Sequence, residues 1–540
     1  MRNIWTLLLM VVAALGGLYL GWVSGHNAVE GETRVGGMSS LLGGTSSSKL
    51  QSVLELINNF YVDPVDMDSL QDMAIPLVLK QLDPHSVYIP RSEVEHVASE
   101  LKSDFGGIGI MFNIRQDTVT VVSVVAGGPC SALGVLPGDR ILEVDGRNFA
   151  GKEAELTNQK VLDNLRGEIG SEVKVKVLRH PDTVLDFDIV RGEIPLVSVV
   201  STYQIAPNVG YLKIDRFAEK TYEEMIAGIA KLKAEGCTHL IVDLRSNSGG
   251  FLNVVQLMCN EFLERGEMIV YTEGAHQRRQ ETRADGTGTC RDMGLTVLID
   301  EYSASASEIF SGAMQDNDRA TIIGRRSFGK GLVQTELTLA DGSNLRLTLS
   351  RYHTPSGRCI QRPYDHGDEE YYQDIAERIK GGELLSADSI KTDTTQIFHT
   401  VKGRTVYGGG GIVPDVFVPY DTTLASRYLY SLRSKRLIYD YALSYVDAHR
   451  QELKALDAKE LIMKLLRTPF INEIKAYSRK NGVTPPSHID AKESHIIENE
   501  VRAYIGQSVS ENDGFYPILN TMDPVIDKAL EVIGVKPIYK

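Results

Sequence analysis

Several features that would place the chain in a well-marked class are missing. The five cysteines are spread along 540 residues and form no Cys-x-x-Cys pair, so we expect neither a disulfide scaffold nor a cysteine-based metal site. No His-Glu-x-x-His string occurs, and we expect no metal. The formal net charge of −14 gives no support for binding nucleic acid. With 42% hydrophobic and 24% charged residues, the composition is that of a globular protein with three or more domains.

A nearly uncharged apolar run covers residues 4–23, with Trp5 and Trp22 near its ends. About twenty apolar residues span the hydrocarbon core of a bilayer, so we expect residues 1–24 to form an uncleaved membrane anchor. A cleavable signal peptide is the alternative, because Arg2 supplies a short positive region before the run. In both cases the bulk of the chain lies outside the cytoplasm. Residues beyond the run, up to Ser48, are rich in Gly, Ser and Thr and are expected to form a flexible tether.

One stretch has a pattern that suits nucleophilic catalysis. An apolar strand at residues 296–300 leads into a small-residue turn at 303–308 and then a helix-like run. A serine there would point its hydroxyl at a helix N-terminus, where unpaired N–H groups favour an oxyanion. No histidine lies between Asp300 and Arg351, so the local candidate base is Lys330, whose pKa burial would lower. The alternative is that the serines only cap a helix.

The strings "SASASEIFSGAMQD" and "RATIIGRRSFGKGLVQ" resemble the active-site signature of the C-terminal processing peptidases, also called tail-specific proteases. In that family the middle serine of the turn is the nucleophile, the lysine of "FGKG" is the general base, and a following glutamine orients the lysine. The resemblance therefore implies that Ser305, Lys330 and Gln334 are catalytic. It also implies an endopeptidase that needs no cofactor.

The string "DLRSNSGGFL" resembles the family's loop beside the active site. There a glycine N–H and the N–H of the residue after the nucleophile form the oxyanion hole. The resemblance implies either Gly249 or Gly250 together with Ala306, and we favour Gly250 because it lies next to the helix expected to begin near Phe251. Both glycines would also permit a tight strand-to-helix turn.

Residues 93–192 change to short β-like runs interrupted by two helical pieces, one of them at residues 152–165. With "FGGIGI" and "PGDRILEVDG", this order resembles a PDZ domain, in which a glycine-rich loop binds a peptide's terminal carboxylate. The loop residues expected to bind the peptide are Gly107, Ile108, Gly109 and Ile110. Val161, Leu162 and Leu165 could line the pocket for an apolar last side chain, although some of them must face the domain core instead.

The fold class implied by the resemblance is an α/β multidomain protein with a crotonase/ClpP-like serine protease core. The expected regions are N-terminal helices at 49–92, the inserted PDZ domain at 93–192, the peptidase core at 193–420 with an insertion at 362–411, and a helical C-terminal extension at 421–540. His85 lies in a Pro-flanked turn, and we expect it to be a structural, hydrogen-bonded histidine.

We therefore expect an extracytoplasmic serine endopeptidase of the bacterial cell envelope, anchored in the inner membrane with its catalytic part in the periplasm. Its substrates would be polypeptides with apolar C-termini. An activating adaptor protein and a homo-oligomer stay open. One alternative is a catalytically silent PDZ scaffold, which would have no need for Ser305, Lys330 and Gln334 together. Another is acyl-thioester chemistry on a crotonase-like core, for which a peptide-reading PDZ domain would have no use.

Overall fold

The computed structural model describes residues 48–94, 97, 104–115, 117–125, 127–179, 182–195, 197–365, 367–422 and 426–539. The chain divides into two compact units, Met1–Val78 and Leu79–Lys540, which are described separately. The expected anchor at residues 1–24 and nearly all of the expected tether lie outside the described residues. In the described part of the chain, no helix combines the length and the apolar character needed to cross a membrane.

The described part of the first unit consists of α3 (Lys49–Phe60) and most of α4 (Met67–Leu79). Both helices form where helical periodicity predicted them. The Ser48 side chain caps α3 by accepting a hydrogen bond from the main-chain N–H of Gln51 at 3.3 Å. No side chain of α3 is buried. Its apolar side chains are therefore partly or fully exposed.

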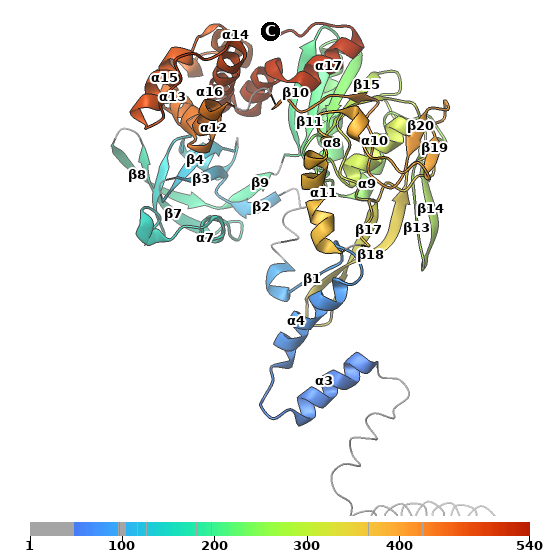
Figure 1. Cartoon of the computed structure of the whole chain (residues 1–540). Coiled ribbons are helices and arrows are strands. Elements are labelled where there is room, and N and C mark those ends of the chain that lie inside the picture. The colour runs from blue at the N-terminus through green and yellow to red at the C-terminus, as the bar shows by residue number, and fades with distance from the viewer. Residues whose placement is uncertain are drawn as a thin grey trace, which may run out of the picture. The chain divides into compact units, whose positions relative to one another are not determined.

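A β-rich domain lies at residues 104–195 of the second unit (Figure 1). Its main strands follow the order β3-β4-β5-β7-β8, with β6 paired beside β5. These strands are β3 (Ile110–Arg115), β4 (Thr118–Val124), β5 (Arg140–Val144), β6 (Arg147–Asn148), β7 (Glu172–Arg179) and β8 (Thr183–Val190). Among the described strands, β3 pairs only with β4, so its other edge is open. Where the chain enters and leaves the domain, β2 (Asp104–Gly107) pairs with β9 (Gly192–Pro195).

The helices of this domain differ from the sequence prediction in one place. A single helix was expected over residues 152–165, whereas the structure has a 3-10 turn at Lys152–Ala154 and then α7 (Asn158–Leu165). The break occurs because Glu155 adopts a left-handed conformation with φ 43° and the Thr157 side chain caps α7. The shorter α6 (Pro129–Leu133) begins at a proline, which is favourable in a first helical turn.

The catalytic region is built on a six-stranded sheet in the order β10-β11-β12-β15-β16-β21. The strands are β10 (Val199–Ala206), β11 (Val209–Ile214), β12 (His239–Asp243), β15 (Gly294–Ile299), β16 (Thr321–Gly324) and β21 (Val416–Phe417). β10 runs antiparallel to β11, and the other pairs are parallel. The near-continuous apolar runs in the central strands are typical of a parallel sheet that is buried on both faces.

Alternation along the strands assigns the two faces of this sheet. Leu212, Val242 and Val297 pack in one cluster with α8 (Thr221–Ala234), α9 (Leu252–Asn260) and α10 (Ala306–Asp316). Their neighbours on the same strands, which include Tyr211, Ile241 and Leu298, pack in a second cluster with α17 (Pro524–Ile533). Because successive strand residues face opposite sides, the sheet lies between three helices on one face and α17 on the other.

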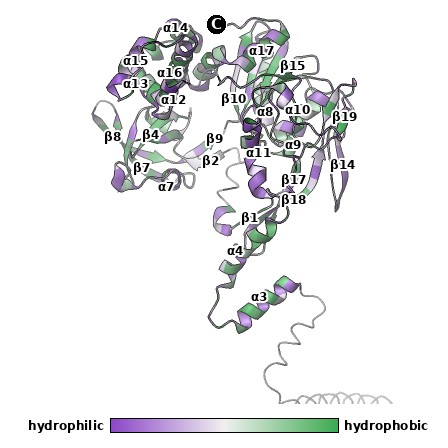
Figure 2. Ribbon diagram, in the orientation of Figure 1, coloured by the Kyte–Doolittle hydropathy of each residue, from purple (hydrophilic) through white to green (hydrophobic). Residues whose placement is uncertain are grey.

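A second sheet has the order β1-β18-β13-β14, with β17 also paired to β18. Its strands are β1 (Val87–Ile89), β13 (Met268–Gly274), β14 (Gln277–Arg283), β17 (Leu332–Thr338) and β18 (Asn344–His353). β13 and β14 form a hairpin that turns after Gly274, and β14 is hydrophilic along its length (Figure 2).

The insertion at residues 362–411 contains α11 (Asp368–Lys380), a 3-10 turn at Ala387–Ser389, and a hairpin of β19 (Ile397–His399) and β20 (Thr405–Tyr407). The C-terminal region is helical, as its pattern predicted, and has its own apolar core. Besides α17, its helices are α12 (Arg427–Ser434), α13 (Leu437–Lys454), α14 (Ala458–Arg467), α15 (Ile471–Lys480) and α16 (Ala491–Leu519).

Candidate active site

The segments that carry the candidate site follow the ends of three neighbouring parallel strands. β12 ends at Asp243 and leads into the glycine loop, β15 ends at Ile299 and leads to Ser305, and β16 ends at Gly324 and leads to Lys330. Because the carboxyl ends of parallel strands lie at one edge of a sheet, segments far apart in the sequence come together there.

Ser305 is the N-cap residue of α10 and has φ 54° and ψ −113°. A non-glycine residue with positive φ is unusual and costs backbone strain, which is often found at functional positions. Its main-chain N–H donates to Glu308 Oε2 at 2.8 Å. Ser305 and Glu308 form a capping box at the start of α10. The helix-capping alternative and a catalytic role are compatible, because a hydroxyl oxygen that accepts a helix N–H still has a proton to donate.

Glu308 is a fully buried carboxylate that the sequence analysis did not single out. Besides the Ser305 N–H, it accepts hydrogen bonds from Ser327 Oγ at 2.5 Å, the Gly329 N–H at 2.7 Å and the Lys330 N–H at 2.9 Å. Burial raises its pKa to about 7, while these donors act in the opposite direction. Glu308 thereby ties the serine turn to the lysine turn.

Lys330 is partly buried, and its Nζ donates to Gln334 Oε1 at 3.0 Å. Gln334 in turn donates from Nε2 to the main-chain oxygen of His85. Burial lowers the pKa of Lys330, and the nearby positive charge of Arg346 lowers it further. Glu308 and Asp83 partly offset this by favouring the ammonium form.

The Tyr352 hydroxyl links the two candidate catalytic residues through their main chains. It lies 2.6 Å from the carbonyl oxygen of Lys330 and 3.1 Å from that of Ser305, within donating distance of both. Its side chain is buried. No local pattern in the sequence links Tyr352 to Ser305, because Tyr352 lies 47 positions later in the chain, on β18.

Ser305, Lys330 and Gln334 line one cleft of about 610 Å³. The described contacts include no hydrogen bond between Ser305 Oγ and Lys330 Nζ. The apolar lining of the cleft includes Leu252, Ile309 and Leu332, and its charged lining includes Glu336 and Arg346 besides Lys330. The cleft thus combines a hydroxyl, an amine of lowered pKa and an apolar wall.

The glycine loop lies in the same cleft. Gly249 packs directly against the serine turn, since a Cβ added to it would lie 2.7 Å from the Cβ of Ser305. Its N–H already donates to Asn247 Oδ1 at 2.9 Å. The N–H groups of Gly250 and Ala306, by contrast, are bonded to no acceptor among the described residues. Of the two glycines, only Gly250 therefore has an N–H available to a ligand.

The PDZ loop lies at the open edge of β3. Gly107, Ile108 and Gly109 are buried, while Ile110 is partly exposed. Gly109 has φ 79°, a conformation that favours glycine. The carbonyl groups of Ile108 and Gly109 accept from Cys130 and Val125, but their N–H groups are bonded to no described acceptor. These two donors are available to an anion.

The three residues of α7 that the sequence could not sort take different positions. Val161 and Leu165 are buried in the core of the PDZ domain. Leu162 is partly exposed and is the one of the three that could touch a bound peptide.

His85 is a partly buried histidine whose Nε2 lies 2.8 Å from the Tyr371 hydroxyl, in agreement with the expected structural role. The described residues contain no group of three or more His, Cys, Asp or Glu side chains arranged to hold a metal ion.

Comparison with known proteins identifies the two main domains. Residues 208–367 match the model of peptidase family S41, residues 106–189 match a PDZ domain, and residues 428–510 match a family of unknown function, DUF8443. The carboxy-terminal-processing protease of Bartonella bacilliformis is 35% identical over 348 residues, which cover 63% of this chain and 79% of that protein. The chain therefore belongs to peptidase family S41, a family of serine proteases.

Two further relatives carry similar names. The carboxy-terminal processing protease CtpB of Bacillus subtilis is 34% identical over 58% of this chain and 65% of its own length. A solved structure of the photosystem II D1 C-terminal processing protease is 24% identical, with a TM-score of 0.38 over 70% of this chain and 88% of that one.

Proposed function

We propose that the chain is a serine endopeptidase that uses a Ser305–Lys330 dyad, with Gln334 orienting the lysine. The single observation that carries this proposal is the cleft that the three side chains share, in which the Lys330 amine is held by Gln334 at 3.0 Å. The lowered pKa of Lys330 supports the same role, because only a neutral amine can accept a proton from a serine hydroxyl.

The reaction follows from these positions. Lys330 accepts the hydroxyl proton as Ser305 Oγ attacks the peptide carbonyl, and the N–H groups of Gly250 and Ala306 stabilise the oxyanion. Collapse of the tetrahedral intermediate breaks the C–N bond, and Lys330 returns the proton to the leaving amine. Lys330 then takes a proton from water, whose oxygen attacks the acyl-enzyme. Release of the second product returns that proton to Ser305 Oγ.

The PDZ domain would select polypeptides by an apolar C-terminus. The free N–H groups of Ile108 and Gly109 suit a terminal carboxylate, and the open edge of β3 suits the peptide as an added strand. Leu162 would contact the last side chain. Docking of the tail would raise the local concentration of the upstream bond at Ser305.

The proposal also covers the type of peptidase fold and the cellular location of the protein. The parallel sheet flanked by helices is compatible with a crotonase/ClpP-like core. The apolar run at residues 4–23 supports an anchor in the inner membrane, with catalysis on the periplasmic side of a bacterial envelope. An activating adaptor and a homo-oligomer are compatible with this arrangement, and neither is needed for the chemistry.

The test uses the full-length chain in detergent and an unfolded reporter protein that ends in apolar residues. Ser305→Ala and Lys330→Ala should each abolish cleavage while leaving the fold intact, because each removes one half of the dyad. Amidation of the reporter's C-terminus should raise KM, because the PDZ loop loses its carboxylate ligand. Cleavage by both variants at the native rate would overturn the dyad. Binding of the tail without cleavage by the native chain would instead favour a silent PDZ scaffold.

A further inference from the structure

The insertion at residues 362–411 contacts both segments that hold Lys330. One is the turn at residues 326–329, which immediately precedes the lysine. The other is the loop at residues 83–86, which carries the carbonyl group that anchors Gln334. The contacts come from Arg362, α11, Glu383 and Gly410, and so from a part of the chain that lies outside both catalytic motifs.

On the turn side, two arginines of the insertion contact the turn, and the side chain of Arg326 in the turn also donates to Glu383 and to the carbonyl oxygen of Gly410. Arg378 of α11 donates to the carbonyl oxygens of Arg326 at 2.6 Å and of Ser327 at 3.1 Å. The guanidinium of Arg362 lies 3.9 Å from the ring centroid of Phe328 and 3.9 Å from that of Tyr371. The two rings also meet edge to face, with centroids 6.1 Å apart. A cation that contacts two rings ties them together, so the helix and the turn are held to one another.

On the loop side, the contacts are made by two tyrosines. The Tyr371 hydroxyl lies 2.8 Å from His85 Nε2, and the two rings meet edge to face with centroids 5.2 Å apart. The Tyr372 hydroxyl donates to the carbonyl oxygen of Pro84 at 2.8 Å. Burial lowers the pKa of His85 to about 4, with a further contribution from the charge of Lys330, so the ring is neutral near pH 7.

From His85 the path to the lysine is short. The main-chain oxygen of His85 accepts from Gln334 Nε2, which leaves Gln334 Oε1 directed at Lys330 Nζ. An amide has a donor end and an acceptor end, so fixing its donor end also fixes which end faces the lysine. If the His85 carbonyl shifts, the amide is free to rotate and the amine loses its acceptor.

We propose that Tyr371 is a positioning residue for the general base, through which the insertion holds His85, Gln334 and Lys330 in line. This inference rests on the proposed function, because it assigns a role in the same catalytic cleft. Asp83 holds the other side of the loop, accepting from the N–H groups of His85 and Ser86 at 2.9 Å each. The loop at residues 83–86 is thus held by Asp83 on one side and by Tyr371 of the insertion on the other.

The test is Tyr371→Phe in the full-length chain, assayed on the unfolded reporter protein across a pH series. The variant keeps the ring and loses only the hydroxyl. We expect kcat to fall about threefold to tenfold, the range that one hydrogen bond gives, while KM stays within about twofold. The acid limb of the kcat profile should move to higher pH, because a loosened loop exposes Lys330 to water and burial is the main cause of its lowered pKa.

The matched control is Tyr364→Phe, which removes a hydroxyl from the same insertion. Tyr364 accepts from Arg351 Nη2 at 2.9 Å, and no hydrogen bond of its hydroxyl to the loop or the turn is found among the described residues. The charged groups facing Lys330, namely Arg346, Glu308 and Asp83, are unchanged in both variants. The control should therefore keep the native kcat and the native acid limb.

Labelling of Ser305 with a fluorophosphonate gives the amount of reactive enzyme, so that kcat is expressed per reactive serine. A native kcat and acid limb in Tyr371→Phe would overturn the inference, and so would a lower kcat without a shift of the acid limb. If that variant did not fold, Tyr372→Phe, which loses only the contact with Pro84, should show the same shift. If the native chain neither cleaves the reporter nor reacts with the probe, the proposed function itself is wrong.

Discussion

At the scale of single residues, the candidate base is shaped by burial and by one neighbouring cation. Lys330 has no histidine beside it in the sequence, and the only histidine in its hydrogen-bonded path acts through a main-chain carbonyl. Its amine must lose a proton before it can act, so each group that lowers its pKa extends activity to lower pH. Arg346 lies in the same cleft and lowers that pKa by charge repulsion.

Arg346→Gln tests this tuning. Removal of the guanidinium should raise the pKa of Lys330, and it also leaves the negative charge of Glu336, its partner at 3.0 Å, without a counter-ion. Both changes favour the ammonium form. The acid limb of the kcat profile should therefore move to higher pH, with little loss of kcat on the alkaline plateau.

The matched control for charge is Arg283→Gln on the exposed hairpin strand β14, which should leave the acid limb of the kcat profile unchanged. The result that would contradict the prediction is an unchanged acid limb in Arg346→Gln. Movement of the limb to lower pH would mean that the freed Glu336 acts as a base itself.

The sequence could predict some of these residues and not others, for a physical reason. Ser305, Lys330 and Gln334 lie in short local motifs, and the structure brings them to one cleft, although their catalytic roles stay predictions. Tyr352 acts through main-chain carbonyl groups of distant residues, so no local pattern marks it. Glu308 lies in a local capping pattern with Ser305, but that pattern does not show that Glu308 also binds the turn that carries Lys330. Contacts of this kind are decided by how the strands pair and not by local spacing.

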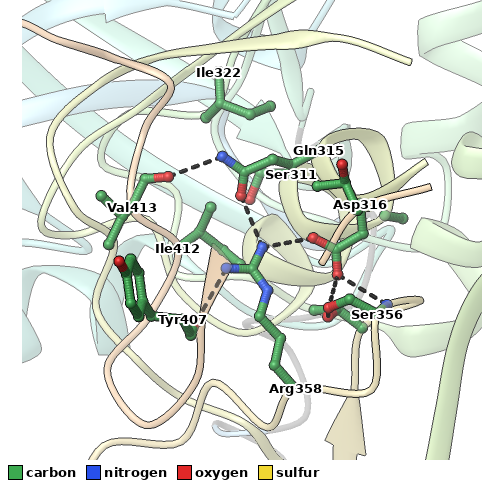
Figure 3. Close-up of polar contacts among 12 residues, drawn as sticks. Ser311, Gln315, Asp316, Ile322, Ser356, Arg358, Tyr407, Ile412 and Val413 are labelled. Carbon is green, nitrogen blue, oxygen red and sulfur yellow. Dashed lines mark hydrogen bonds and ion pairs between the residues drawn. The ribbon is translucent and has the colours of Figure 1, made fainter. Parts of the chain in front are cut away.

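At the scale of elements, α10 is anchored at its far end by a buried ion pair. Arg358 and Asp316 are both fully buried, and the Arg358 Nη2 group lies 2.7 Å from Asp316 Oδ1 and 2.7 Å from Gln315 Oε1 (Figure 3). Arg358 Nη1 also donates to the carbonyl oxygen of Tyr407 in the insertion, at 3.1 Å. The insertion therefore supports α10, whose first turn follows Ser305, as well as the lysine turn.

Asp316→Asn should destabilise the chain strongly. The substitution keeps the shape of the side chain but leaves the buried guanidinium of Arg358 without a counter-ion. Removing one partner of a buried pair typically costs about 3–5 kcal/mol of the free energy of unfolding. The measurement is the urea midpoint of unfolding, monitored by far-ultraviolet circular dichroism.

The control is Glu377→Gln, which breaks an exposed pair with Lys380 in which the side chains are 58% and 71% exposed. It should cost less than about 1 kcal/mol, because exposed pairs are screened by water and salt. Equal midpoints for the two variants would show that the buried pair does not hold α10. Replacing both buried partners together, with Arg358→Met and Asp316→Leu, should recover much of the loss.

The insertion shows where prediction from sequence ends at this scale. Its start is acidic and tyrosine-bearing, and neither α11 nor the place of that helix was predicted from the sequence. A helix that covers a cleft and a helix that supports a catalytic turn can have the same amphipathic pattern. The difference lies in individual pairings, such as Arg378 with the carbonyl groups of the turn, that no periodicity encodes.

At the scale of the whole second unit, the C-terminal region is part of the catalytic fold. α17 covers one face of the six-stranded sheet, with Ile526 and Leu530 packed against Ile241, Leu298 and Ile323. A sheet face of this kind cannot stay exposed to water without losing the stabilisation that its burial provides. The sequence predicted helices here but no role, because α17 lies far along the chain from the strands that it covers.

An ion pair joins this helix to the candidate oxyanion loop. Asp523, the N-cap residue of α17, lies 2.7 Å from Arg245 Nη1, and Arg245 begins the loop that leads to Gly250. Arg245 also binds Asp243 at the end of β12, at 2.6 Å. Loss of α17 should therefore disturb the loop as well as the sheet.

Ile526→Ala tests whether α17 and the peptidase sheet fold as one unit. Ile526 is 1% exposed, and a cavity of this kind typically costs about 2–5 kcal/mol. If the helix is integral, the urea midpoint of the catalytic region and the amount of fluorophosphonate-reactive Ser305 should fall together.

Val532→Ala on the same helix is the control, because that side chain is 43% exposed and its loss should cost less than about 0.5 kcal/mol. A catalytic region that keeps its midpoint in Ile526→Ala would mean that α17 is only appended to the sheet, and that the peptidase ends before the C-terminal helices begin.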